Sequence, residues 1–144
     1  MKAELRAFLA LSREDRGSLA RAWVYLLLAD LALRILPINR VGALLRLLGG
    51  RPGRGRRRKE IPPDRLAHLV GIAGRHHLHP ITCLPRSLAL QALLRRHGIE
   101  AELRIGVRRE AGEMRAHSWI EHAGRPVGEP ADVELRFQAL QHPR

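Results

Sequence analysis

Apolar residues recur every three or four positions over residues 19–35, and Pro37 follows, which predicts an amphipathic helix that ends before the proline. The segment VGALLRLL, residues 41–48, repeats this spacing and stops at two glycines. Together these segments predict a helical hairpin with one apolar face. We expect the hairpin to form a layer over the core of the second half, with binding to a partner protein as the alternative.

The second half of the chain begins with two expected helices. Two prolines precede a short helix that is expected to start at Asp64 and to break near residues 71–74, where glycines occur. A longer helix is expected over residues 83–97, because leucine and alanine form a broad apolar stripe and Pro85 suits a first turn. Gly98 is placed where a C-terminal cap is needed.

Short strands are expected after the long helix. Apolar and polar residues alternate over residues 103–107, which predicts a half-buried strand. The segments 117–122 and 125–127, separated by an Ala-Gly dipeptide, predict two further strands joined by a tight turn. A helix followed by an antiparallel meander is typical of the α+β class.

The composition indicates a globular protein without intramolecular disulfides or a membrane span. The chain has 144 residues, of which 45% are apolar, and this suits a compact globular domain. The single cysteine excludes an intramolecular disulfide and a cysteine-rich metal site, and it indicates a reducing compartment. The most membrane-like segment, residues 22–29, falls far short of the roughly 20 apolar residues that a spanning helix needs. We therefore expect a cytoplasmic protein with neither a membrane span nor a cofactor.

Positive charge is concentrated in one short stretch. The formal net charge is +12, and six basic side chains lie in the segment RPGRGRRRK, residues 51–59. Because glycine, proline and like charges cannot build a core, residues 51–63 are expected to be an exposed linker between a helical region, 1–50, and a core, 64–144. The same cations could neutralise phosphates, so a basic nucleic-acid-binding module without catalysis is the alternative function. The scarcity of aromatic residues argues against that alternative, and no nucleic acid is expected.

Cys83 stands at the expected start of the long helix. Free backbone N–H groups and the positive end of the helix dipole at that place favour a thiolate and could hold a developing oxyanion. A lone cysteine is also often a buried apolar side chain, so a second group is needed for a catalytic interpretation. His117, on a strand later in the chain, supplies an imidazole that could pair with the thiolate and protonate a leaving amine. This order predicts an α+β, papain-like or transglutaminase-like core, in which the cysteine helix packs on an antiparallel sheet.

Two motifs carry a resemblance to a known family. CLPRSLALQALLRRHGIEAELRIGV, residues 83–107, and AHSWIEHAGRPVGE, residues 116–129, resemble the transglutaminase-like leader peptidases of lasso-peptide biosynthesis in residue type, order and spacing. The string LADLALRILP in the first half is also similar to the N-terminal region of that family. The resemblance implies a cysteine protease that cleaves the leader peptide from a precursor, with Cys83 as nucleophile and His117 as general acid and base. It also implies two partners, a small leader-recognition protein and an ATP-dependent lasso cyclase.

The third catalytic position is less well defined by the motif. In the family it is an aspartate shortly after the histidine, and in this chain Glu129 stands there, with Asp132 as the alternative. Because side chains alternate along strands, a three-residue turn over residues 123–125 would bring Glu129 to the face of His117. A two-residue turn would instead favour Asp132. We expect the three-residue turn and Glu129, whose carboxylate would orient the imidazole.

Other polar residues near the motifs have simpler expected roles. The histidines of residues 76–79 lie close to Cys83 in the sequence but lack a companion pair at zinc-binding spacing, so no metal is expected. Ser87, one helical turn after Cys83, is expected on a polar helix surface. Trp119 shares the face of His117 and either shields the site or packs in the core.

Overall fold

The computed structural model describes residue 6, residues 8–50 and residues 61–140, and the basic stretch 51–59 lies outside these residues. Helices come first along the described chain and an antiparallel sheet follows, which confirms the α+β class. The helices and strands in chain order are α2 (Arg13–Leu33), α3 (Ile38–Leu48), α4 (Pro63–Arg75), α5 (Cys83–Arg96), β1 (Glu102–Glu110), β2 (Glu113–His122), β3 (Arg125–Val127), α6 (Val133–Arg136) and β4 (Gln138–Ala139).

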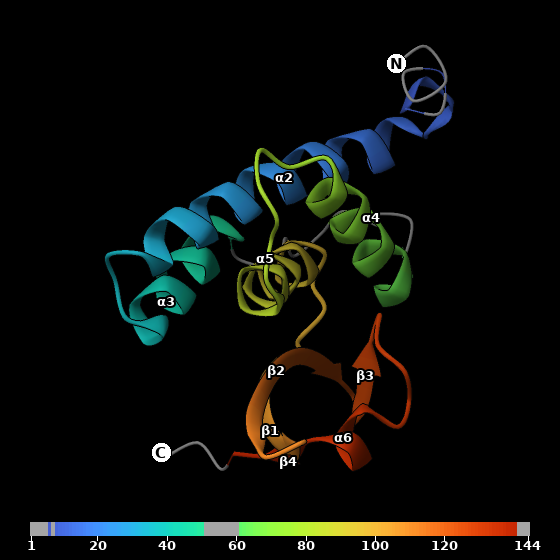
Figure 1. Ribbon diagram of the computed structural model, residues 1–144. Helices are drawn as coiled ribbons and strands as arrows, with labels where there is room; N and C mark the ends of the chain where they lie inside the picture. Colours follow the sequence, from blue (N-terminus) through green and yellow to red (C-terminus); the bar gives the residue numbers. More distant parts are fainter. Residues whose placement is uncertain (1–5, 7, 51–60, 141–144) are drawn as a thin grey trace.

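Helix α5 lies between the other long helices and the sheet (Figure 1). Its side chains Leu88, Leu93 and Leu94 are at most 2% exposed, because α2, α3 and α4 pack on one side of α5 and β2 packs on the other. Leu26 of α2 and Val41 of α3 are fully buried in the same core. The helical hairpin of the first half is therefore a layer over this core, as the sequence predicts.

The helix ends follow local chemistry, with one exception. The side chain of Ser12 accepts a hydrogen bond from the Asp15 amide at 3.0 Å and begins α2. Gly98, with φ +77°, follows α5 as the expected C-terminal cap. The expected break at residues 71–74 is wrong, since α4 continues to Arg75. Burial of its apolar face outweighs the cost of about 1 kcal/mol that each helical glycine imposes.

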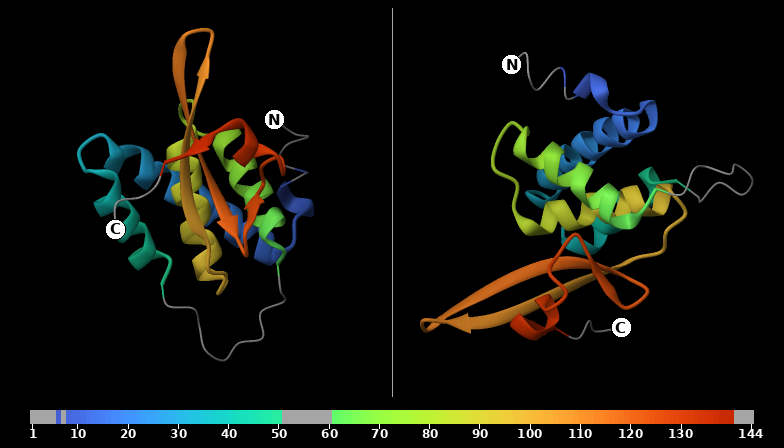
Figure 2. Two further views of the ribbon diagram at one scale, coloured as in Figure 1. Left: turned by 90° about the horizontal axis from the view of Figure 1, so that it is seen from below. Right: turned by 90° about the vertical axis from the view of Figure 1, so that its right-hand side faces the viewer.

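The sheet is antiparallel with strand order β3-β2-β1-β4. β1 and β2 form a long hairpin in which Gly106 lies opposite His117. Figure 2 shows the far end of this hairpin projecting past the helices as a two-stranded ribbon, and residues 109–116 on it are exposed. The base of the hairpin is the part that contacts α5.

The turn between β2 and β3 differs from the expectation. His122 pairs with Arg125, so the connection has two residues, Ala123 and Gly124, and the expected three-residue turn is wrong. Both turn residues have positive φ, +49° and +71°, which is the backbone of a tight turn that matches the twist of the strands. The alanine tolerates a left-handed conformation that the sequence pattern alone did not assign to it.

Two short elements that the sequence pattern did not predict, α6 and β4, lie beyond β3 on the sheet. β4 pairs with β1 at Gly106 and Val107. The residue between α6 and β4, Phe137, approaches Trp119 with ring centroids 6.4 Å apart, and Trp119 is only 1% exposed. This segment thus helps to cover the face of the sheet that points away from α5.

Gly106 makes this cover possible. A Cβ atom at this position would lie 2.8 Å from the Cβ of Phe137 and 2.9 Å from Cη2 of Trp119, closer than carbon atoms pack. The indole of Trp119 and the Cβ of Phe137 therefore sit directly on the backbone of β1, opposite His117.

Gly106→Ala should lower the free energy of unfolding by about 1–3 kcal/mol, because the added methyl group must displace the indole of Trp119 and the Cβ of Phe137. Thermal unfolding followed by circular dichroism should show Tm falling by several degrees. Gly71→Ala in α4 is the control, since the nearest atom to its new Cβ is the flexible Nη1 of Arg75 at 3.7 Å and alanine favours the helix. An unchanged Tm for Gly106→Ala would contradict the close packing at Gly106.

Candidate active site

Cys83 is the first residue of α5 and is partly buried. The residue before it, Thr82, makes no side-chain capping hydrogen bond, and the first turn of the helix contains no acidic side chain. Since the ring nitrogen of Pro85 carries no hydrogen, the amides of Cys83 and Leu84 are the N–H groups that the helix start can offer. This end of α5 can therefore receive a negative charge.

A buried pair of serines fixes the start of α5 on the sheet. Ser87 Oγ donates to the carbonyl oxygen of Ser118 at 3.0 Å and lies 3.2 Å from Ser118 Oγ. Ser87 comes one turn after Cys83 on the same helix face, and Ser118 directly follows His117 on β2. The expectation of a solvated Ser87 is wrong, because its hydroxyl finds partners inside the interface and only 5% of the residue is exposed. The serine pair brings the helix turn that begins at Cys83 against the strand that carries His117.

His117 is paired with a carboxylate. Its Nε2 atom lies 3.1 Å from Oε1 of Glu129, and about a quarter of each side chain is exposed, 25% and 27%. Asp132, the alternative, instead accepts a hydrogen bond from Arg136 at 2.8 Å. The structure therefore brings Glu129 rather than Asp132 to the imidazole.

Glu129 reaches His117 in spite of the two-residue turn. Pairing between β2 and β3 ends at Val127, and Gly128 then takes a left-handed conformation with φ +70°. The alternation of side chains along β3 stops at this glycine, so the face of Glu129 is set by the bend and not by the length of the turn. The parity argument from the sequence fails for this reason, although the residue that it favoured is the one found beside His117.

The helix that carries Cys83 and the imidazole of His117 lie on opposite faces of the sheet. Side-chain alternation on β2 directs Ser118 toward α5 and His117 toward the other face. Beside His117, however, β2 has no pairing with β3 in the described chain, since that ladder ends at Ile120. Among the described residues the edge of β2 at His117 is therefore open on the side away from β1. In the described residues no hydrogen bond joins Cys83 to His117, and such contacts often tighten only when substrate binds.

Aromatic rings and a small hollow surround the His117–Glu129 pair. The imidazole lies 5.1 Å from the ring of Phe137 and stacks on Trp119 at 6.2 Å, with an interplanar angle of 19°. A hollow of about 200 Å³ opens beside the pair. It is lined by His117, Glu129, Pro130, Val133, Phe137 and the side chains of Arg108 and Arg136. The packed rings limit the rotation of the imidazole and leave its hollow side accessible.

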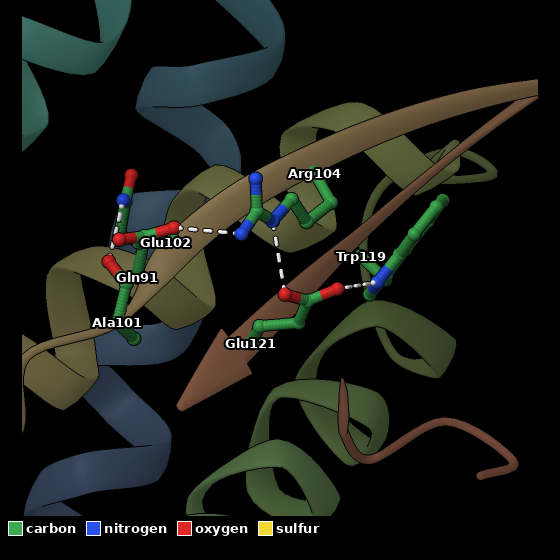
Figure 3. Close-up of polar contacts among 6 residues, drawn as sticks. All are labelled: Gln91, Ala101, Glu102, Arg104, Trp119 and Glu121. Carbon is green, nitrogen blue, oxygen red and sulfur yellow. Dashed lines mark hydrogen bonds and ion pairs between the residues drawn. The ribbon is translucent and has the colours of Figure 1, made fainter. Parts of the chain in front are cut away.

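A network of polar contacts fixes the indole of Trp119 through Glu121 and Arg104 (Figure 3). The indole Nε1–H of Trp119 donates to Oε1 of Glu121, and Nε of Arg104 donates to Oε2 of the same carboxylate, both at 2.9 Å. Burial alone would raise the pKa of Glu121, but hydrogen bonds from Glu134, Trp119 and Arg104, together with the charge of Arg104, hold that pKa below its usual value. The same contact with Glu121 raises the pKa of Arg104.

The pKa of Glu134, on α6, is shifted by the same carboxylate of Glu121. Its hydrogen bond to Glu121 and the negative charge of that residue raise the pKa of Glu134. The pair is most stable when Glu121 is ionised and Glu134 keeps its proton. Glu134 therefore stabilises the folded protein at pH values below its ordinary pKa, and this stabilisation is lost as pH rises through its raised pKa. The stabilisation of the folded protein by ionised Glu121 is lost at acidic pH, as pH falls through its lowered pKa.

Three other histidines of the described chain have contacts away from His117. His77 packs on Trp23 with ring centroids 5.0 Å apart, and His79 approaches Asp30 at 3.7 Å. His122 Nδ1 lies 2.6 Å from the carbonyl oxygen of Glu100, between the start of β1 and the end of β2. Within the described residues, His, Cys, Asp and Glu side chains form no group of three that could hold a metal ion. None of the helices among those residues is both long and apolar enough to cross a lipid bilayer.

Glu134→Gln should stabilise the protein near neutral pH, because the amide keeps a hydrogen-bond donor and removes the repulsion between two carboxylates. We expect Tm to exceed that of the parent by about 1–3 °C at pH 7, and the difference to shrink as the pH is lowered toward 4. Tm measured at half-unit pH steps tests this, with Glu113→Gln at the exposed hairpin tip as the control. A Tm difference that does not vary with pH would show that Glu134 shares no proton with Glu121.

Comparison with known protein families identifies the fold family of the chain. The family model described as the Transglutaminase-like superfamily matches residues 25–142, a span that includes Cys83, His117 and Glu129. No curated protein and no solved structure gives a significant match to the chain. The superfamily includes cysteine peptidases, and its fold confirms the expected helix-on-sheet core. Because the match runs through most of the chain and across both motif-bearing elements, the chain belongs to the transglutaminase-like superfamily.

Proposed function

We propose that the protein is a cysteine peptidase that removes the leader peptide from a ribosomally made lasso-peptide precursor. The observation that carries the proposal is the hydrogen bond between His117 and Glu129. His117 lies on β2, the strand against which the first turn of the Cys83 helix packs through Ser87. Membership of a superfamily that includes cysteine peptidases supports the chemistry. The resemblance of the two motifs to lasso leader peptidases supports the substrate class.

The proposed reaction passes through a thioester. The thiolate of Cys83 attacks the carbonyl carbon of the scissile bond, and the amides at the start of α5 stabilise the negative charge that develops on the carbonyl oxygen. Protonated His117 gives its proton to the leaving amine as the C–N bond breaks. The neutral imidazole then takes a proton from water, whose oxygen attacks the thioester carbonyl. The C–S bond breaks, which releases the leader as its carboxylic acid and restores the thiolate of Cys83 and protonated His117. Glu129 keeps the imidazole oriented and stabilises its cationic form.

The expected partners are the leader of the precursor, a small leader-recognition protein and the lasso cyclase. The basic stretch of residues 51–59 is proposed to help dock an acidic leader or its recognition protein, with a solvated linker as the simpler alternative. These residues lie outside the described part of the chain, so the proposal for them rests on their charge alone.

Replacing Cys83 by alanine should abolish cleavage of a candidate precursor while the circular dichroism spectrum and Tm stay close to those of the parent. His117→Ala should lower kcat nearly as much, because the two groups act as a unit. The measurement is cleavage followed by mass spectrometry, together with labelling by a cysteine-directed electrophile, which should modify Cys83 near neutral pH in the parent. His122→Ala is the control and should keep its activity, because His122 lies at the end of β2, where its ring contacts the carbonyl oxygen of Glu100 and not His117. Full activity of the Cys83→Ala variant would end the peptidase proposal.

The two carboxylates after β3 should differ in their effect on turnover. Glu129→Gln should lower kcat by about 100-fold or more, since the amide cannot stabilise the imidazolium that forms during proton transfer. Asp132→Asn should leave kcat nearly unchanged, because Asp132 contacts Arg136 instead of His117. Steady-state kinetics on the same precursor decides between them. The reverse order would assign the orienting role to Asp132.

A further inference from the structure

The backbone just before Glu129 is attached to α4. The amide N–H of Gly128 donates to Oδ1 of Asp64 at 3.0 Å, although 64 positions separate the two residues in the chain. Asp64 lies in the first turn of α4, one residue after the helix begins at Pro63. A side-chain carboxylate of a helix thus holds a main-chain donor of the segment that leads to the proposed site.

Gly128 also presses against α4 sterically. A Cβ atom on this residue would lie 2.5 Å from the Cβ of Ala67, one turn after Asp64. Its φ of +70° is a conformation that residues with a side chain rarely adopt. Glycine is therefore required here both for the bend and for the close approach to α4, and the hydrogen bond to Asp64 is made at that point of contact.

The bend at Gly128 sets the direction of the next side chain, which is Glu129. The sheet does not hold this bend, because the pairing of β3 with β2 ends one residue earlier, at Val127. Glu129 then reaches Nε2 of His117 at 3.1 Å. The chain of contacts thus runs from the carboxylate of Asp64 through the Gly128 amide and the Glu129 carboxylate to the imidazole.

We infer that Asp64 is a positioning residue, which fixes the bend at Gly128 so that Glu129 is held against His117. The inference rests on the proposed function only in that Glu129 orients a catalytic imidazole. The hydrogen bond from Gly128 requires an acceptor oxygen at position 64, and asparagine can supply one while alanine cannot. Asp64 is itself exposed, so its replacement removes this contact without opening a cavity in the core.

A neighbouring ion pair supplies a matched control. Asp15 of α2 accepts a hydrogen bond from Arg65 of α4 at 2.9 Å. Its partner is adjacent to Asp64, so Asp15→Ala also removes an acidic contact to the first turn of α4. Asp15 does not contact Gly128, and its loss therefore reports the effect of loosening α4 alone.

The test compares Asp64→Ala, Asp64→Asn and Asp15→Ala by two readouts. The first is the NMR chemical shift of His117 Nε2 at one fixed pH, which responds to the hydrogen bond with Glu129 and needs no substrate. Asp64→Ala should move this resonance in the direction in which Glu129→Gln moves it, whereas Asp64→Asn and Asp15→Ala should leave it near the parent position. The second readout is kcat, which Asp64→Ala should lower about tenfold with little change in KM. Combined with Glu129→Gln, Asp64→Ala should cause no further fall in kcat.

Several outcomes would overturn the inference. An unmoved His117 resonance in Asp64→Ala would do so, as would an equal displacement in Asp15→Ala or a failure of Asp64→Asn to restore the parent position. If the parent protein cleaves no precursor, the proposed function fails, and the resonance still decides whether Asp64 positions Glu129. The two failures are therefore distinguishable.

Discussion

The hydrogen bonds between Ser87 and Ser118 determine how the helical half of this protein meets its sheet. The rest of the contact between α5 and β2 is built from apolar side chains, which pack well in more than one offset. Two hydroxyl groups inside such a contact remove that freedom, because a shift of one residue would leave both buried and unpaired at a cost of about 1–3 kcal/mol each. The offset that satisfies them also sets the start of α5, where Cys83 lies, beside the part of β2 that contains His117.

On the face of β2 that points away from α5, aromatic packing rather than hydroxyl pairing fixes the side chains. The chain contains five aromatic residues, two of which, Trp119 and Phe137, lie beside His117. They can pack there because Gly106 has no side chain, and the indole is further held by Glu121. The imidazole is thus confined by rings on the sheet face that the long helices α2–α5 do not cover, while the proposed nucleophile, Cys83, belongs to a helix on the other side. The proposed site takes one group from each side of the sheet and therefore needs both faces to be fixed independently.

The sequence predicted the parts of this structure that depend on periodicity. The 3.6-residue spacing identified α2, α3 and α5, and the alternating pattern identified β1 and the end of β2, so the helix-borne cysteine and strand-borne histidine could be placed. Properties that depend on contacts between distant segments could not be predicted. Ser87 looks like a surface residue until Ser118 is known to face it, and Gly71 looks like a helix break until the burial around it is known. Glu129 lies beside His117, as expected, but the expected turn length is not the reason, since the chain bends at Gly128, where it contacts Asp64 and Ala67 of a distant helix.

The projecting hairpin gives the molecule a gradient of local stability. Beyond Arg108 and Arg115, β1 and β2 pair only with each other in the described chain, and neither face rests on a core. A two-stranded ribbon of this kind opens from its tip at little cost, because no buried apolar area is lost when it does. Opening reaches the Gly106–His117 pair only after passing into the part of the hairpin that is flanked by β4 and covered by Phe137. The tip can therefore change in length or sequence between related proteins, and can open and close in solution, while the geometry around the imidazole stays the same.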